Sequence, residues 1–230
     1  MKKSHLFEWS AWVAAGVVLF MVSQWTDFDF WLQDHIYDAT QHAFPLRNHW
    51  LLQDVLHDGI KKVVVALWLG LLGIRLFAHK VGLPAVWVRG LNYLLISSVL
   101  IAGSIAFLKH HTHIFCPWDL IRYGGDQPFV PLIGSEPATT RTGQCWPAGH
   151  VSTALSFLGA YFFLREINRP LARKVLVGIV TLFVVLGAAQ TLRGAHFLSH
   201  NLWSLWWAWG VAMSVAVFYP PVIPEAENDV

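Results

Sequence analysis

The sequence predicts an all-α, polytopic membrane protein in which six transmembrane helices carry functional loops on the outer face of the membrane. Three observations favour this class: an apolar composition, six separate apolar segments, and an uneven division of basic residues between the connecting loops. Of the 230 residues, 55% are hydrophobic and only 13% are charged. A soluble domain carries roughly 25% charged residues, so the composition excludes an ordinary soluble enzyme or binding module.

The six apolar segments approach the length that crosses a bilayer, which is about 20 residues. The first looks like a signal peptide but lacks a small-residue cleavage site, so we expect it to be retained. The second and fourth are short, and we expect them to recruit flanking residues. The sequence shows neither an internal repeat nor a linker, so one domain over residues 1–230 is expected. The expected spans cover about residues 9–25, 62–78, 90–108, 150–165, 174–192 and 201–219.

Basic residues concentrate in the loops that would share one side of the membrane. Lys80 and Arg89 follow the second span with no acidic residue between them, whereas residues 27–58 contain six Asp and one Arg. The positive-inside rule therefore predicts that both termini are cytoplasmic. In a bacterium this places the protein in the inner membrane with its functional loops facing the periplasm. Those outer segments are residues 26–62, 109–150 and 193–201.

The two long outer segments differ in character. In residues 26–62, the apolar positions of "FDFWLQDHIYDATQHAF" are weakly helix-periodic, which predicts a short interfacial helix. Residues 109–150 are rich in Gly, Pro and Thr, a composition typical of irregular structure around a site. All outer segments adjoin the ends of spans, so their side chains can converge at one border of the membrane.

Three polar clusters mark the outer ends of the spans. The first is "KHHTHIFCPWDL" from Lys109, the second is "CWPAGH" ending at His150, and the third is "QTLRGAHFLSHN", which contains Arg193, His196 and His200. Taken singly, such residues can be snorkelling cations and interfacial imidazoles. Together they suit a phosphate group, because Lys and Arg bind its oxygens while one His attacks phosphorus and another protonates the leaving oxygen.

The order and spacing of the first two clusters resemble the phosphatidic acid phosphatase type 2 superfamily, whose pattern is K-x6-R-P, then P-S-G-H, then S-R-x5-H-x3-D. Six residues separate Lys109 from Cys116-Pro117, so Cys stands where the family has Arg. The stretch "PAGH", residues 147–150, matches the second motif with Ala for Ser. The resemblance spans all six apolar segments and implies a six-span membrane phosphatase.

In the third motif, Gln190 takes the Arg position, His196 the nucleophile position and His200 the Asp position. The resemblance implies that His196 attacks phosphorus to form a phosphohistidine, and that His200, one helical turn later, orients His196 by a hydrogen bond. His150 would protonate the leaving lipid alkoxide and then activate water. An alternative register makes His200 the nucleophile, since it lies seven residues after Arg193.

Further residues complete the expected site. Lys109, Arg193 and Gly149 are expected to bind the phosphate, which also suits the helix N-termini expected near His150 and His196. Residues that could support the pocket or reach its mouth are Gln190, Arg122 and His57.

The run "HHTH" raises a metal alternative. Zinc could bind His110, His111 or His113 together with His150 or His196. Carboxylates suited to a two-metal phosphatase are few in this loop, which contains Asp119, Asp126 and Glu136. We therefore expect neither a metal nor another cofactor.

The two cysteines, Cys116 and Cys145, both fall on the predicted outer side. An even number of cysteines in an oxidising compartment favours a disulfide between them, and two free, buried thiols are the alternative. A bridge would tie the segment that follows Lys109 to the segment that precedes His150.

The expected function is hydrolysis of a phosphomonoester or diphosphate on a lipid. Members of the family act on undecaprenyl diphosphate, phosphatidylglycerol phosphate, phosphatidic acid or lipid A phosphates. The alternatives are a lipid phosphotransferase and a non-catalytic membrane protein that binds anions or lipids, such as a transporter. Transport is disfavoured because the spans are nearly free of charge, with Arg75 close to an end. The expected partners are a lipid phosphate and the bilayer, and no nucleic acid.

Overall fold

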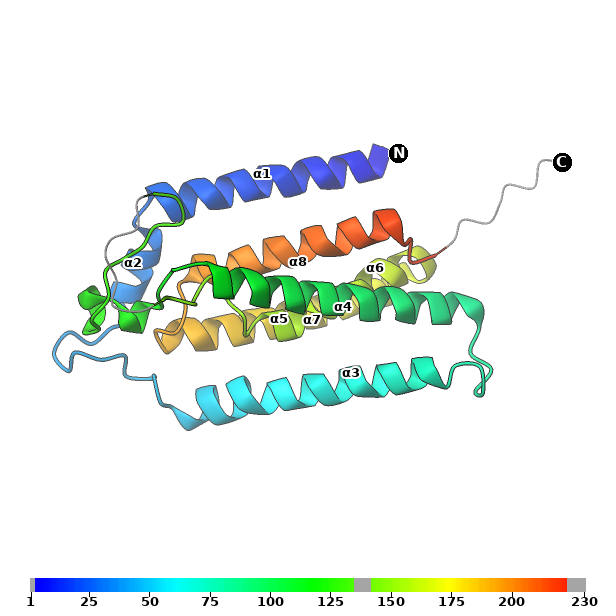
Figure 1. The fold of residues 1–230 in the computed structure, drawn as a ribbon, viewed down its shortest axis with the longest axis horizontal. Coiled ribbons are helices and arrows are strands. Elements are labelled where there is room, and N and C mark those ends of the chain that lie inside the picture. The colour runs from blue at the N-terminus through cyan, green and yellow to red at the C-terminus, as the bar shows by residue number, and fades with distance from the viewer. Residues whose placement is uncertain (1–2, 135–141, 223–230) are drawn as a thin grey trace.

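The computed structural model describes residues 3–134 and 142–222, and these residues form helices and loops without a β-strand. The all-α class is therefore confirmed. Long helices run side by side along one axis, and α1 begins at the same end of the bundle at which α8 finishes (Figure 1). The elements of the bundle are α1 (Lys3–Trp25), α3 (Ile60–Leu76), α4 (Ala85–His111), α5 (Ser152–Leu155), α6 (Leu158–Ile167), α7 (Arg169–Leu192) and α8 (Leu198–Phe218).

Each of the six predicted spans is helical, but the fourth is interrupted. Expected as one segment over residues 150–165, it begins at Ser152 and divides into α5 and α6 around Ser156 and Phe157. Hydroxyl side chains bond to backbone carbonyls throughout this stretch: Ser152 donates to Gly149 O, Thr153 to His150 O and Ser156 to Thr153 O. Such local bonds compete with the regular helical pattern and bend helices.

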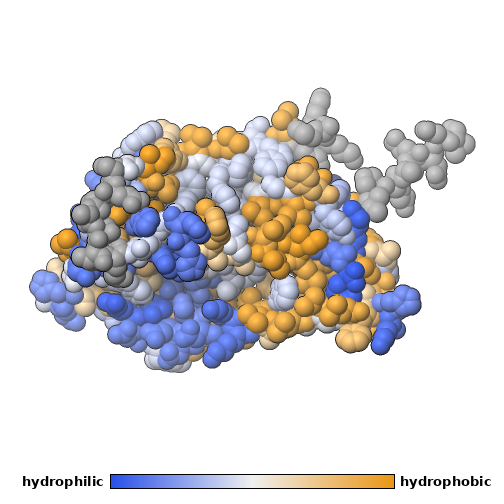
Figure 2. Space-filling model, in the orientation of Figure 1, coloured by the Kyte–Doolittle hydropathy of each residue, from blue (hydrophilic) through white to orange (hydrophobic). Residues whose placement is uncertain are grey.

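Three helices are long and apolar enough to cross a membrane by length and composition: Leu6–Trp25, Ala85–His111 and Arg169–Leu192. Only 6% of the window in Leu6–Trp25 is buried within the protein, so the apolar side chains of α1 require an apolar environment outside it. Hydrophobic residues cover much of the surface between the two ends, while hydrophilic residues gather at the end where α2 lies (Figure 2). These features are those of a membrane protein. The other three spans remain predictions.

A short helix, α2 (Phe28–Asp34), is present where the interfacial helix was predicted, and it turns away from the C-terminal end of α1 (Figure 1). The sequence did not predict the second helical piece of this segment, a π-helical stretch at Leu51–Gly59 that leads into α3. Both pieces lie at the end of the bundle where α4 finishes and α8 begins.

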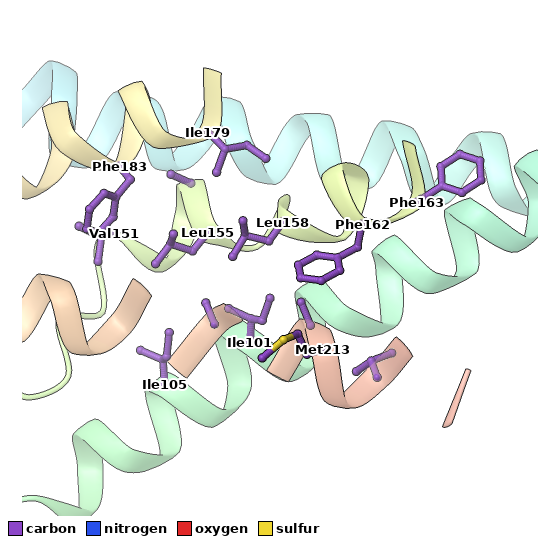
Figure 3. Close-up of a cluster of buried hydrophobic side chains, with 14 of the residues drawn as sticks. Ile101, Ile105, Val151, Leu155, Leu158, Phe162, Phe163, Ile179, Phe183 and Met213 are labelled. Atoms are coloured by element: carbon purple, nitrogen blue, oxygen red, sulfur yellow. The ribbon is translucent and has the colours of Figure 1, made fainter. Parts of the chain in front are cut away.

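The main core lies where α4, α5, α6, α7 and α8 meet. Figure 3 shows Ile101, Leu155, Leu158, Phe162 and Met213 pointing into this interior, and each is at most 4% exposed. A second, smaller cluster holds the outer loops together; its buried members are Phe44, Ile114, Phe115, Leu120, Tyr123, Val130 and Phe197. This cluster gives the loop segments a fixed shape, so that they can position side chains at the end of the bundle.

The peripheral helix α1 is attached to α8 by a pair of tryptophans. The rings of Trp12 and Trp206 stack at 4.2 Å, and each indole N–H donates to the backbone carbonyl of the other residue. Gly16 makes this contact possible, because a Cβ there would lie 2.6 Å from the Trp206 ring. The contact places α2, which follows α1, over the N-terminus of α8.

Candidate active site

The structure brings the three polar clusters together at the end of the bundle that α2 covers. Lys109 lies in the last turn of α4 and packs against the "PAGH" loop. A Cβ placed on Gly149 would lie 3.6 Å from the Lys109 ammonium nitrogen, so the ammonium lies beside Gly149 with about one side-chain atom's space between them. The two residues expected to bind phosphate from the first and second motifs are therefore neighbours.

His150 lies in the loop just before α5 and is only 9% exposed. Its Nε2 lies 3.1 Å from the carbonyl oxygen of Leu56, and its ring stacks on that of His57 with 4.4 Å between centroids. The π-helical stretch thus forms one wall around His150. His57 lies where the sequence analysis expected a supporting residue.

Arg193 caps the C-terminus of α7 and is 6% exposed. Its guanidinium donates to Arg47 O at 2.8 Å, to Gln53 Oε1 at 3.1 Å and to Gln190 Oε1 at 3.4 Å. All three acceptors are uncharged, so these bonds orient the guanidinium without neutralising its charge. Burial lowers the pKa of Arg193, and the charges of Asp58 and Asp54 act in the opposite direction.

The backbone around Gly194 depends on glycine. Gly194 adopts φ +72°, and a Cβ there would lie 2.3 Å from the ring of Phe44. The turn brings the amides of Ala195 and His196 back to Gln190 O, at 2.9 and 3.3 Å. Gln190 therefore supports the third motif through its backbone and its side chain.

His196 lies before α8, and His200 lies in the first turn of that helix. The expectation that they share one helical face is wrong, because α8 begins only at Leu198. Their rings pack edge-on with 5.9 Å between centroids and 66° between planes. In the structure, His196 Nδ1 lies 3.2 Å from Cys145 Sγ, while His200 Nδ1 is buried without a hydrogen-bond partner among the described residues. Edge packing thus replaces the expected His200–His196 hydrogen bond.

Burial lowers the pKa of His196 well below its ordinary value, and the neighbouring His200, Lys109 and His150 lower it further. At neutral pH the imidazole is therefore uncharged. An uncharged imidazole has a nitrogen lone pair and can act as a nucleophile.

The disulfide between Cys116 and Cys145 is present, with 5.2 Å between the Cα atoms. It joins the end of the first motif to the loop of the second, as predicted. The two sulfurs and a ring nitrogen of His196 lie within 4.8 Å of one another, but the sulfurs are bonded to each other and are not thiolates that could bind zinc. None of the histidines of "HHTH" belongs to this group, and Glu136 lies outside the described residues.

Arg122 does not reach the site. Its guanidinium makes two hydrogen bonds to Asp34, at 3.0 and 2.6 Å, and lies 4.9 Å from the centroid of the Phe30 ring. The Arg122 side chain is 54% exposed. It fastens α2 to the loop between α4 and α5, as an ordinary residue of this border, and does not reach the mouth of the pocket.

Two residues of α2 contact the third motif and were missed by the sequence analysis. The fully buried Gln33 donates to the carbonyls of Thr191 and His196, at 3.3 and 3.0 Å. Asp29 accepts from the backbone N–H of Ser199 at 3.0 Å. The pKa of Asp29 is raised by burial and lowered by its bonds to Ser199. The sequence does contain a signal for them: Asp29 and Gln33 are four residues apart on a short amphipathic helix, a spacing that places both side chains on one face.

The second motif is also bonded to the third. The amide of Ala148 donates to His200 O at 3.1 Å, and Ser204 Oγ donates to Ala148 O at 2.8 Å. These bonds run between the "PAGH" loop and the first turns of α8. The backbone thereby fixes the position of His150 relative to His196.

Comparison with protein families places the chain in a family. The family model of the PAP2 superfamily matches residues 87–223, which include all three motifs. No curated protein and no solved structure matches the chain. The match covers more than half of the sequence and begins in α4, so the helices before it lie outside the matched region. The chain belongs to the PAP2 superfamily, whose members are generally phosphatases.

Proposed function

We propose that this protein is a membrane-bound phosphatase that hydrolyses a phosphomonoester or a diphosphate of a lipid through a phosphohistidine intermediate. One observation carries the proposal: the end of an apolar helical bundle brings together Lys109, His150 and His196, which supply a cation and two imidazoles. A lipid phosphate suits this arrangement, because its charged group lies at the membrane border while its hydrocarbon chain stays in the bilayer.

Phosphate binding is assigned to Lys109, Arg193 and the backbone N–H of Gly149. The ammonium and the guanidinium stabilise the charge on the phosphoryl oxygens, and this stabilisation is strong in a buried site. Three neutral acceptors already orient the Arg193 side chain, so it loses little conformational freedom when the substrate binds.

In the first step, Nε2 of His196 attacks phosphorus. An N–P bond forms, the P–O bond to the lipid breaks, and His150 gives a proton to the leaving oxygen. In the second step, His150 removes a proton from water, the resulting hydroxide attacks phosphorus and the N–P bond breaks. Inorganic phosphate leaves, and both imidazoles return to their starting protonation states.

The proposed arrangement in the membrane has six crossings, cytoplasmic termini and the site on the outer face of the inner membrane. It is supported by helices at all six predicted positions, and by α1 beginning at the same end at which α8 finishes. The loop between α3 and α4, which contains Lys80, and the junction of α6 and α7, which follows Arg165, lie at this same end, opposite the site (Figure 1).

Phosphate release from purified protein in detergent tests the function directly. The substrates would be undecaprenyl diphosphate, phosphatidylglycerol phosphate, phosphatidic acid and a lipid A phosphate, each with and without a chelator. We expect chelator-resistant release from at least one of them, and none from His196→Ala. Transfer of the phosphoryl group to a lipid acceptor without free phosphate would indicate a phosphotransferase. Binding without turnover on every substrate would contradict the proposal and favour a non-catalytic lipid-binding protein.

A further inference from the structure

A small cavity lies where α2, the "PAGH" segment and the first turn of α8 meet. Its volume is about 30 Å³, and polar residues from all three segments line it: Asp29, Trp146, Ser199 and His200. Val130 of the long outer loop forms part of its apolar wall. A volume of this size accommodates one water molecule, provided that polar partners surround it.

Two buried polar atoms belong to residues that line this cavity. Nδ1 of His200 and Nε1 of Trp146 are both buried, and neither has a hydrogen-bond partner among the described residues. His200 is only 4% exposed. Buried polar groups in folded proteins nearly always have a partner, either in the protein or in an ordered water. The cavity that both residues line is where such a partner can lie.

Asp29 supplies the acceptor on the other side of the cavity. One of its carboxylate oxygens accepts from the Ser199 N–H at 3.0 Å, and the residue lines the cavity. A carboxylate has about four acceptor positions, so this bond leaves capacity for a further donor. Gln33, one turn later in α2, bonds to the carbonyls of Thr191 and His196 and holds Asp29 in place.

We propose that the cavity binds one water molecule that links Asp29 to His200, and that Asp29 thereby positions the imidazole that stands at the Asp position of the third motif. The water accepts from Trp146 Nε1–H, and it donates to His200 Nδ1 and to the Asp29 carboxylate. Three hydrogen bonds are typical of a buried water.

This arrangement favours the His200 tautomer that carries its proton on Nε2, where the Cys145 backbone accepts a hydrogen bond, because the bond made by one ring nitrogen sets the state of the other. The His200 ring packs edge-on against His196 at 5.9 Å. When the His200 ring is held in place, it restricts the orientation of the His196 ring that packs against it. Asp29 is a positioning residue and touches no reacting atom. The inference rests on the proposed function, in which His196 is the nucleophile.

The test compares Asp29→Asn with Asp27→Asn. An Asn amide oxygen still accepts from the Ser199 N–H, so the variant removes the charge and keeps the cap on α8. Asp27 lies two residues earlier, is exposed, and does not line the cavity. Nitrogen NMR of histidine-labelled protein in detergent reports the tautomer of each imidazole, with the His200 signal assigned from its loss in His200→Asn.

We expect wild-type protein and Asp27→Asn to show His200 with its proton on Nε2, and Asp29→Asn to show a mixture of tautomers. We also expect Asp29→Asn to lower kcat about 10–100-fold with KM unchanged. Losses of this size follow when a residue that orients a functional histidine through a hydrogen bond is replaced. An unchanged tautomer or an unchanged kcat in Asp29→Asn overturns the inference. Absence of phosphatase activity in the wild-type protein overturns the proposed function. The tautomer measurement does not depend on activity, so it still tests whether the cavity binds the water molecule.

A second pair of variants keeps the inference testable if Asp29→Asn does not fold. Val130→Leu adds a methylene group to the cavity wall and excludes the water, whereas Val130→Ala leaves room for it. We expect only Val130→Leu to alter the His200 tautomer and to lower kcat. Equal tautomers and equal kcat in the two variants overturn the inference.

Discussion

Cys145 Sγ lies 3.2 Å from Nδ1 of His196, so the disulfide contacts the proposed nucleophile as well as joining two loops. A disulfide sulfur has no hydrogen to donate and is a weak acceptor. Only the tautomer with its proton on Nδ1 makes a favourable contact here. That tautomer leaves the lone pair on Nε2, the atom to which we assign the attack on phosphorus.

The first prediction concerns this disulfide. Loss of a bridge between residues 29 positions apart is expected to lower the free energy of unfolding by roughly 3–4 kcal/mol on the chain-entropy model. The double variant Cys116→Ala/Cys145→Ala should therefore melt at a lower temperature and release phosphate more slowly. Thiol titration of denatured wild-type protein should detect no thiol before reduction and two after it. Two reactive thiols before reduction would show that the bridge is absent.

The second prediction concerns pH. The pKa of His196 is lowered in the folded state, so below its ordinary pKa of about 6.5 the unfolded chain binds a proton that the folded chain does not. Stability is therefore lost as the pH falls below about 6.5, by about 1.4 kcal/mol for each pH unit from this group while it stays neutral in the fold. Above that pH the contribution of His196 is constant.

Thermal unfolding at several pH values between 4.5 and 7.5 measures this effect. Other groups also titrate over this range, so the comparison is with His196→Gln, which lacks the titrating imidazole. The wild type should lose more stability on acidification than the variant does. Parallel curves for the two proteins would show that His196 is not held neutral by burial.

The third prediction compares two arginines. Arg193→Lys should lower kcat/KM about 10²-fold. A planar guanidinium can donate to Arg47, Gln53 and Gln190 and still bind a phosphate, whereas an ammonium group cannot make all of these hydrogen bonds. Arg122→Lys is the matched control, since that guanidinium pairs with Asp34 on the surface. Steady-state phosphate release measures both. A loss in Arg122→Lys equal to that in Arg193→Lys would contradict the assignment of Arg193 to the site.

The fourth prediction separates the two registers of the third motif. His200→Ala should lower phosphate release by about 10²–10⁴, the scale of a group that assists proton transfer or orientation. His196→Ala should abolish it. An inactive His200→Ala together with an active His196→Ala would make His200 the nucleophile. Size-exclusion profiles of both variants check that they still fold.

The positions of the helices could be predicted from the sequence, because they depend on local runs of apolar residues. The six helical segments follow from apolar runs such as residues 90–108, which became α4. The break in the fourth segment was not predicted, because local hydroxyl bonds of Ser152, Thr153 and Ser156 decide it and hydropathy does not report them.

The site was predictable where spacing in the chain carries the information. Lys109, His150 and His196 were found from their motifs, and the cysteine pair was found from its count and compartment. Asp29 and Gln33 were missed because they act across more than 150 residues of sequence. The packing of α1 on α8, through the stacking of Trp12 on Trp206 and the bond from Trp203 Nε1–H to Ser23 Oγ, places α2 where they reach the third motif. Arg122 could not be placed for the same reason, since its partner Asp34 lies on that helix.

Trapping of the phosphoenzyme tests the central claim most directly. Purified protein would be mixed with a lipid phosphate labelled with ³²P, quenched within the first turnover and analysed for label bound to the chain. The account predicts acid-labile, base-stable label on His196 in the wild type and in His110→Ala, which removes an exposed imidazole from the last turn of α4. It predicts no label in His196→Ala. Label retained in His196→Ala, or phosphate release by that variant at the wild-type rate, would contradict it.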